Sequence, residues 1–279
     1  MKLNLFTILL MAALTFTGNN INAQFKIGKP KLNAKAVDAS VNGVKAATFS
    51  NEDAIKLSKQ SVEWMDAHNP VAAEDDAYTI RLNHLFANHI SENGLTLNFK
   101  VYKVIDINAF ACADGSVRVF SSLMNILTDN EILAVIGHEI GHVKNEDTKD
   151  AIKSAYTRVA VKDAAASQSG AARALSESEL GDFAEGFLSA SHSRKQESEA
   201  DGYSYNFLKT NNYNVVGAYT AFKKLSLLSG KADKTTSQKM MSSHPDSEDR
   251  ANEVKKKAEQ DGIWKDPGEV KLPTEKLTN

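Results

Sequence analysis

The stretch of sequence that decides the fold is Thr128-Asp-Asn-Glu-Ile-Leu-Ala-Val-Ile-Gly-His-Glu-Ile-Gly-His-Val143. It predicts a helix, because Thr128 can act as the N-cap while Glu131, three residues later, reaches back to the same backbone. Apolar side chains recur at helical spacing and predict a broad buried face, made of Ile132, Val135, Ile136, Ile140 and Val143.

This predicted helix carries an H-E-x-x-H pattern, formed by His138, Glu139 and His142. Side chains at positions i and i+4 share one face of a helix, so the two imidazoles can bind one metal ion. Glu139 lies beside them, where it can take a proton from the attacking water. The competing interpretation is a pair of histidines bonded to ordinary neighbours, with Glu139 in solvent. An acidic motif further along the chain favours the metal site.

That acidic motif lies in a second predicted helix, residues 193–208, where Ser193 and Gln196 form another capping box. Glu197 and Asp201 are one turn apart and share a face. Glu197 suits a third metal ligand, and Asp201 suits an acceptor for a histidine ring N–H. Two imidazoles and one carboxylate leave one tetrahedral position open, which is the composition of a catalytic zinc site with one Zn²⁺ per chain. The alternative is a solvated acidic face.

Composition sets limits on the class of protein. The chain has 279 residues, of which 42% are hydrophobic and 24% charged, which suits one domain of about 200–250 residues or two small ones. Its net charge of −2 gives no basic excess, so no nucleic-acid partner is expected. Cys112 is the single cysteine, so no intrachain disulfide can form, and a structural thiol is expected rather than a nucleophile.

The first residues predict export. Lys2 precedes an apolar run over residues 5–16, and Ile21-Asn-Ala23 is an acceptable cleavage site, so residues 1–23 are predicted to be a signal peptide. The protein is therefore expected to be periplasmic or secreted. The residue directly after the cleavage point is not a cysteine, which argues against a lipid anchor. No later run reaches 18 apolar residues, so no transmembrane segment is expected in the mature chain, although peripheral envelope association stays open.

The segments before the metal helix read as two helices and a small sheet. Residues 24–47 look like a linker, and helices are predicted over 51–68 and 74–93, the second ending at Asn93-Gly94 as a C-cap. Alternating side chains predict a strand over 95–103 that continues to residue 107. The next segments are a turn-rich connection at 108–115, a strand at 116–121 and a short helix at 122–127. The exposed edge of the 116–121 strand is expected to add a substrate peptide as a further strand.

After the metal helix, the chain is predicted to stay helical to about residue 166. Residues 168–181 are rich in Ala, Ser and Gly and fit either a mobile lid or a solvated helix-loop-helix, of which the second is favoured. Further helices are expected over 215–228 and up to about Gln260, and 265–279 looks like a tail. His244 precedes Pro245 at the start of the last helix. Such a histidine can point into a cleft, although by itself it reads more readily as a surface residue.

Taken together, these motifs resemble the HtpX/CAAX-protease family of zinc metallopeptidases, and most of all its small exported bacterial members of the LoiP type. The resemblance covers about residues 48–262. It is carried by Asn108-Ala-Phe-Ala111, Gly115-x-Val-Arg-Val119, Leu123-Met124, Asp129-Asn-Glu131, the H-E-x-x-H pattern, Arg194-x-x-Glu197-x-x-Ala-Asp201 and His244-Pro-(x)4-Arg250.

The resemblance implies an α+β, mostly helical gluzincin-type domain over residues 48–264, with a small antiparallel sheet beside the active-site helix. It implies zinc ligands at His138, His142 and Glu197, with Glu139 as catalytic acid and base. It also implies that His244 enters the active site. Asn108, which opens the first motif, is expected close behind the site together with Asp201.

The function expected on this basis is zinc-dependent hydrolysis of peptide bonds in unfolded or misassembled exported proteins. The developing oxyanion needs a donor besides the metal, and His244 or Arg250 can supply it. In the resting enzyme, His244 can instead occupy the open metal position. One alternative is a zinc-bearing chaperone or binding module whose peptidase activity is dispensable. Another is an exported zinc hydrolase that acts on bonds other than peptides; the predicted edge strand favours peptides.

Overall fold

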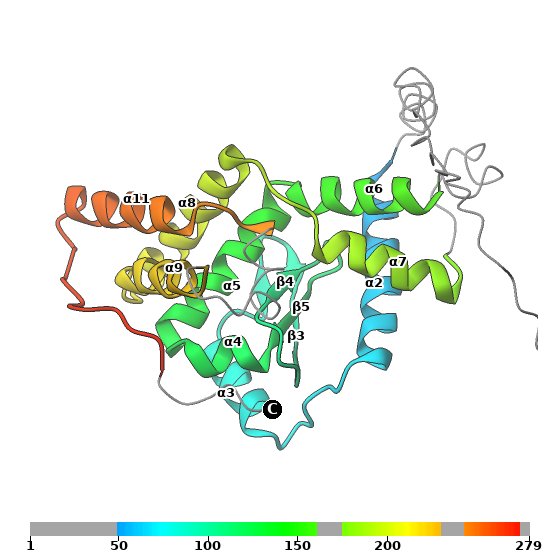
Figure 1. Ribbon diagram of the computed structural model, residues 1–279, viewed down its shortest axis with the longest axis horizontal. Coiled ribbons are helices and arrows are strands. Elements are labelled where there is room, and N and C mark those ends of the chain that lie inside the picture. Colours follow the sequence, from blue (N-terminus) through cyan, green and yellow to red (C-terminus); the bar gives the residue numbers. More distant parts are fainter. Residues whose placement is uncertain (1–48, 161–174, 230–242, 274–279) are drawn as a thin grey trace, which may run out of the picture.

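The structure, a computed structural model, describes residues 49–160, 175–229 and 243–273 (Figure 1). The predicted signal peptide and linker lie outside the described residues, as do residues 161–174 and 230–242 and the end of the tail. The predicted α+β fold is confirmed, since helices surround one small sheet. Among the described helices, none is both long enough and apolar enough to cross a membrane.

Nine helices belong to the described part of the chain. Their bounds are α2 Asn51–His68, α3 Ala77–Leu85, α4 Ser121–Ile126, α5 Asp129–Lys144, α6 Asp147–Ala160, α7 Glu177–Leu188, α8 Arg194–Thr210, α9 Val216–Ser229 and α11 Ser247–Gln260. The predicted capping boxes form at both motif helices. The Thr128 backbone N–H donates to Glu131 at 2.6 Å, and the Gln196 N–H donates to Ser193 at 3.3 Å. Residues 177–181 of the predicted lid or loop are the start of α7.

The central sheet has the strand order β3-β5-β4, with β3 Asn98–Tyr102, β4 Ala109–Ala111 and β5 Ser116–Phe120. Strand β5 pairs antiparallel with β4 and parallel with β3, so the sheet is mixed. The prediction that the 116–121 strand offers a free edge is wrong, because β5 is the central strand. The segment 108–115, expected to be only a turn-rich connection, contributes β4, which is one of the two edge strands, the other being β3.

The hairpin before the sheet corrects a second expectation. The helix predicted over 74–93 ends at Leu85, and the strands β1 Ser91–Glu92 and β2 Leu95–Thr96 pair antiparallel around Asn93-Gly94. Both turn residues have positive φ, 52° and 79°, which is the backbone of a type I′ turn. An Asn-Gly pair favours this type of turn more strongly than it favours the end of a helix. The predicted strand extension to residue 107 is also absent, since β3 ends at Tyr102.

Both faces of the sheet are buried, and strand alternation sorts its side chains between two cores. Val101, Val117 and Val119 face the core around α5, whereas Tyr102 and Phe120 face a second core built with α2, α6 and α7. Figure 1 shows the same arrangement, with α5 on one side of the strands and α2, α6 and α7 on the other. Cys112 is buried in the second core as a free thiol, as expected.

Helices α5 and α8 approach each other closely because small residues meet at their crossing. A Cβ added at Gly141 would lie 3.0 Å from the Ala200 Cα and 3.1 Å from its carbonyl oxygen. Two turns earlier on α5, the Ser204 hydroxyl donates to the Ala134 carbonyl at 2.6 Å. These contacts bring the face of α8 that carries Glu197 directly against the histidines of α5.

A buried ion pair fastens the outer helix α2 to the sheet. Arg118, on the second-core face of β5, is 2% exposed and donates to both carboxylate oxygens of Asp66 on α2, at 2.8 and 2.9 Å. Lys100 and the Tyr102 hydroxyl also donate to this carboxylate, at 2.8 and 2.7 Å. Burial opposes ionisation, but these donors outweigh it and lower the pKa of Asp66 below its ordinary 3.8.

We expect Asp66→Asn to lower the free energy of unfolding by about 2 kcal/mol at pH 7. This is less than for a fully enclosed pair, because Asp66 keeps some contact with water. Because the folded-state pKa of Asp66 is lowered, the stabilisation is complete above pH 3.8 and is lost as pH falls through the folded value. Urea unfolding from pH 7 to 3 should therefore show a gap to wild type that begins to narrow below pH 3.8, with exposed Asp75→Asn as control. A gap that stays constant would contradict the ion-pair account.

Candidate functional site

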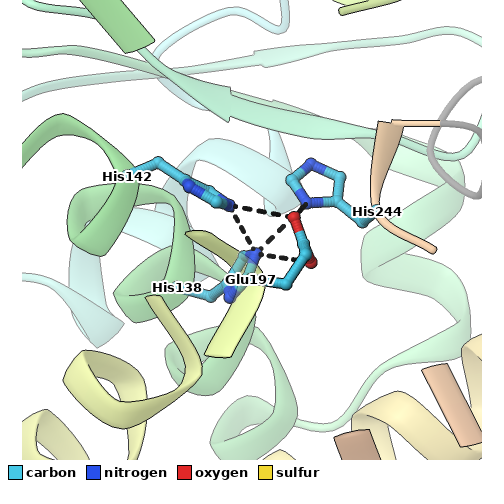
Figure 2. A group of neighbouring side chains, drawn as sticks. All are labelled: His138, His142, Glu197 and His244. Carbon is cyan, nitrogen blue, oxygen red and sulfur yellow. Dashed lines mark hydrogen bonds and ion pairs between the residues drawn. The ribbon is translucent and has the colours of Figure 1, made fainter. Parts of the chain in front are cut away.

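Four buried side chains meet where α5, α8 and the segment before α11 come together. They are His138, His142, Glu197 and His244, and one ligand atom from each lies within 4.8 Å of the others. Figure 2 shows the three rings and the carboxylate pointing toward one common point. His244 therefore lies beside the two histidines of α5 and Glu197.

The spacing of these atoms fits a tetrahedral metal ion. Ligand atoms about 2.0–2.1 Å from a tetrahedral zinc lie about 3.3 Å from one another. The Nε2 atoms of His138 and His142 are 3.0 Å apart, and Glu197 oxygens lie 3.6 and 3.3 Å from them. The Nδ1 atom of His244 is 3.2 Å from His138 and 3.0 Å from Glu197. These residues could hold a metal ion with little rearrangement.

The contacts of each ring on the side away from the cluster explain why a cation can bind here. His138 Nδ1 is 2.9 Å from Asp201, and His142 Nδ1 is 2.9 Å from Asp147. A carboxylate requires a donor, so each Nδ1 carries the hydrogen and each Nε2 of a neutral ring presents a lone pair. Two lone pairs facing each other at 3.0 Å repel unless a proton or a metal ion lies between them.

The electrostatics of the two rings agree with this geometry. Burial, reinforced by the charge of Arg250, lowers the pKa of His138 to about 3, so this ring is neutral. Burial acts the same way on His142, but hydrogen bonds to Asp147 and Glu197 outweigh it and raise its pKa to about 9. Without a metal ion, the pair therefore keeps one proton. For Glu197, bonds from His142 and His244 outweigh burial and hold its pKa far below the usual range.

Glu139 lies next to this cluster but has no comparable partners. Its side chain is buried, and its Oε1 atom makes no hydrogen bond with the described residues. The closest ionisable neighbour that it faces is His244, whose Nε2 lies 3.7 Å from Oε1. Burial raises the pKa of Glu139, and the nearby charge of Glu197 adds to the effect. A carboxylate in this state is a better proton acceptor than one in water.

Arg250 holds the carboxylates of α8 in place. Its guanidinium donates to both oxygens of Asp201, at 2.8 and 2.6 Å, and lies 2.6 Å from Glu197 Oε2. The ring of Phe222 covers its flat face at 4.1 Å. Asp201 thus accepts hydrogen bonds from Arg250 and from the ring of His138. It lies on the side of this ring that faces away from the metal cluster. The guanidinium is occupied by two carboxylates and is poorly placed to contact an oxyanion.

Asn108 also lies at the site, where a pocket opens beside Glu139. Its side-chain oxygen accepts the backbone N–H of Ala109 at 2.9 Å, and its side chain is buried. Strand β4 forms one wall of this pocket, and α6 and the end of α7 form another. The lining includes Ala109, Phe110, Ala111, Glu139, His142, Thr148, Ala151, Phe187, Leu188, Ala190, His192 and His244.

Two residues of the site were missed by the sequence analysis. Asp147, the partner of His142, begins α6 after a sharp turn in which Glu146 has a φ of 65°. An acidic residue shortly after the second histidine was the available signal, although such residues are common. His192 stacks on His142, with ring centroids 4.0 Å apart and an angle of 16° between the planes. Nothing in its sequence context indicates this contact.

Comparison with known proteins agrees with this geometry. The profile of Peptidase family M48 matches residues 81–258, which include every residue of the cluster. The chain belongs to peptidase family M48. Metalloprotease YcaL of Escherichia coli (strain K12) is 41% identical over 223 residues, which span 79% of this chain and 85% of the relative. Metalloprotease LoiP of the same strain is 37% identical over 229 residues, spanning 81% and 89%. The M48 chain is thus a metalloprotease with peptide or protein substrates.

We expect His142→Ala and Glu197→Ala to lose bound metal, because each removes one of the converging ligand atoms. Glu199→Ala is the matched control: Glu199 is exposed on the same helix and pairs only weakly, with Lys195 at 3.7 Å. Elemental analysis of the purified proteins should give metal in wild type and in the control, and little in the two ligand variants. Full metal content in both ligand variants would place the metal elsewhere.

Proposed function

We propose that the protein is a zinc-dependent endopeptidase in which His138, His142 and Glu197 hold one zinc ion and Glu139 is the general base. The observation that carries the proposal is the facing pair of Nε2 atoms, 3.0 Å apart beside a buried carboxylate, with Glu139 Oε1 making no hydrogen bond to the described residues at the same place. Imidazole and carboxylate ligands of this number are typical of catalytic zinc.

A zinc ion bound there would lower the pKa of a water and polarise the scissile carbonyl. Glu139 accepts the proton of the attacking water and then delivers it to the leaving amine. Its raised pKa suits both steps, because the carboxylate must hold the proton for a time and then release it. Asp147 and Asp201 keep the two imidazoles oriented, and Arg250 keeps Glu197 and Asp201 in place.

His244 has two compatible roles in this scheme. Its Nδ1 atom lies within ligand spacing of His138 and Glu197, so in the resting enzyme it can occupy the fourth metal position. When a substrate binds, the ring moves aside and donates to the oxyanion. The occupied guanidinium of Arg250 makes His244 the better of the two predicted oxyanion donors.

We propose that the substrate peptide lies along the open edge of strand β4. The Phe120 N–H donates to the Asn108 carbonyl, and the Cys112 N–H donates to the Ser116 carbonyl, so residues 108 and 112 face β5. By alternation, the backbone groups of Ala109 and Ala111 face away from β5. No further strand of the described residues pairs with this side. An extended peptide can pair there and pass Glu139, which requires a substrate with free backbone groups.

The predicted signal peptide suggests where the substrates are. Export would make them unfolded or misassembled proteins of the envelope, and the enzyme a quality-control protease there. We further propose that the catalytic domain spans residues 48–264 and that the chain belongs to the HtpX-like branch of its family, as the combined motifs suggest.

We expect Glu139→Gln to keep the fold and the metal but to slow peptide hydrolysis by about 10²–10⁴-fold, because an amide cannot accept the water proton. Cleavage of an unfolded casein-like substrate by the purified proteins, with metal analysis of both, tests the assignment. Activity within a few-fold of wild type, at equal metal content, would mean that another group is the base.

We expect Ala111→Pro to reduce kcat/KM for unfolded substrates by about 3–10-fold, since it removes one outward backbone donor, which is typically worth about 0.5–1.5 kcal/mol. Proline is tolerated at an edge strand whose N–H faces outward, so the melting temperature and metal content should stay close to wild type. Unchanged kcat/KM in a folded, metal-loaded variant would exclude β4 as the peptide-binding edge.

A further inference from the structure

His192 lies between α7 and α8, directly beside the metal cluster but outside its ligand set. Its ring covers one face of His142, with centroids 4.0 Å apart and planes 16° from parallel. No hydrogen bond joins the His192 ring to another described residue, so its contact with His142 is made through the ring face.

The orientation of His142 depends on contacts at both of its nitrogens and on contacts with its ring. Asp147 fixes its Nδ1 edge at 2.9 Å. The ring of His138 meets it edge to face, with centroids 4.5 Å apart and an interplanar angle of 87°. Its Nε2 edge lies 3.3 Å from Glu197, but contacts at the two nitrogens still permit the ring to tilt about the line that joins them. The flat ring of His192 blocks this movement on one side and keeps water from that face, so that His142 is only 1% exposed.

The backbone of His192 is tied to the segment that carries His244. Its N–H donates to the Ser243 carbonyl at 3.1 Å, and the rings of His192 and His244 lie 5.3 Å apart. The next residue, Ser193, is the N-cap of α8, the helix that supplies Glu197. His192 therefore contacts or adjoins all three segments that form the cluster.

We propose that His192 is a positioning residue that holds the imidazole of His142 in the orientation required for metal binding, through ring stacking rather than through its nitrogens. The inference rests on the proposed function, because it assumes that His142 is a metal ligand. It predicts that a flat apolar ring replaces His192 and that a small side chain does not.

The test compares His192→Ala with His192→Phe. Phenylalanine keeps a ring that can stack but has no nitrogen, whereas alanine removes the ring. His68→Ala is the matched control, because His68 stacks in the same way on Trp64, at 4.1 Å and 17°, far along the chain from the metal motifs. Zinc affinity is measured by competition with a chromophoric chelator, and the ligand geometry is followed by the visible absorption of the Co²⁺-substituted protein.

We expect His192→Ala to weaken zinc binding about tenfold, the lower end of the loss found when residues supporting metal ligands are removed. Its Co²⁺ spectrum should change, whereas the spectra and affinities of His192→Phe and His68→Ala should match wild type. Equal affinity in alanine and phenylalanine variants, whether both are weak or both are normal, would overturn the stacking role. If wild type itself binds no zinc, the proposed function fails first, and the two failures are distinguished.

Discussion

The structure depends on holding two imidazole nitrogens 3.0 Å apart with their lone pairs facing each other. This arrangement is unfavourable unless a proton or a metal ion lies between the two nitrogens, and other parts of the molecule are arranged to maintain it. Asp147 and Asp201 fix the protonated edge of each ring. Gly141 and Ala200 let α8 come close enough for Glu197 to reach the same point. Arg250 compensates the two carboxylates of α8.

The sheet provides the second constraint, because it is buried on both faces. Its α5 side carries the metal helix, and its other side packs against α2, α6 and α7. Helix α6 and the end of α7 also form a wall of the pocket beside Glu139. The Asp66–Arg118 pair holds these layers together across the central strand. A substrate at the β4 edge would therefore lie between the sheet and side chains from the second core. The enzyme would recognise the free backbone groups of this substrate.

The sequence was sufficient for the parts of the site that repeat at helical spacing. The capping boxes at Thr128 and Ser193 and the i, i+4 spacing of His138 and His142 predicted the two motif helices and their facing sides. The order of the strands in the sheet could not be predicted from the sequence, because β4 has only three residues and no alternation long enough to detect. The Asn93-Gly94 pair was interpreted as a helix end although it is also the strongest short hairpin signal. Asp147 and His192 reach the site through a turn and a loop, so no periodicity marked them.

The measurement that tests the central claim most directly is anomalous diffraction at the zinc absorption edge, from crystals of the full chain prepared without added chelator. The account predicts one strong peak about 2.0–2.2 Å from Nε2 of His138, from Nε2 of His142 and from a carboxylate oxygen of Glu197. A structure with these two nitrogens still 3.0 Å apart, no peak between them in zinc-supplemented crystals, and zinc bound elsewhere would contradict it.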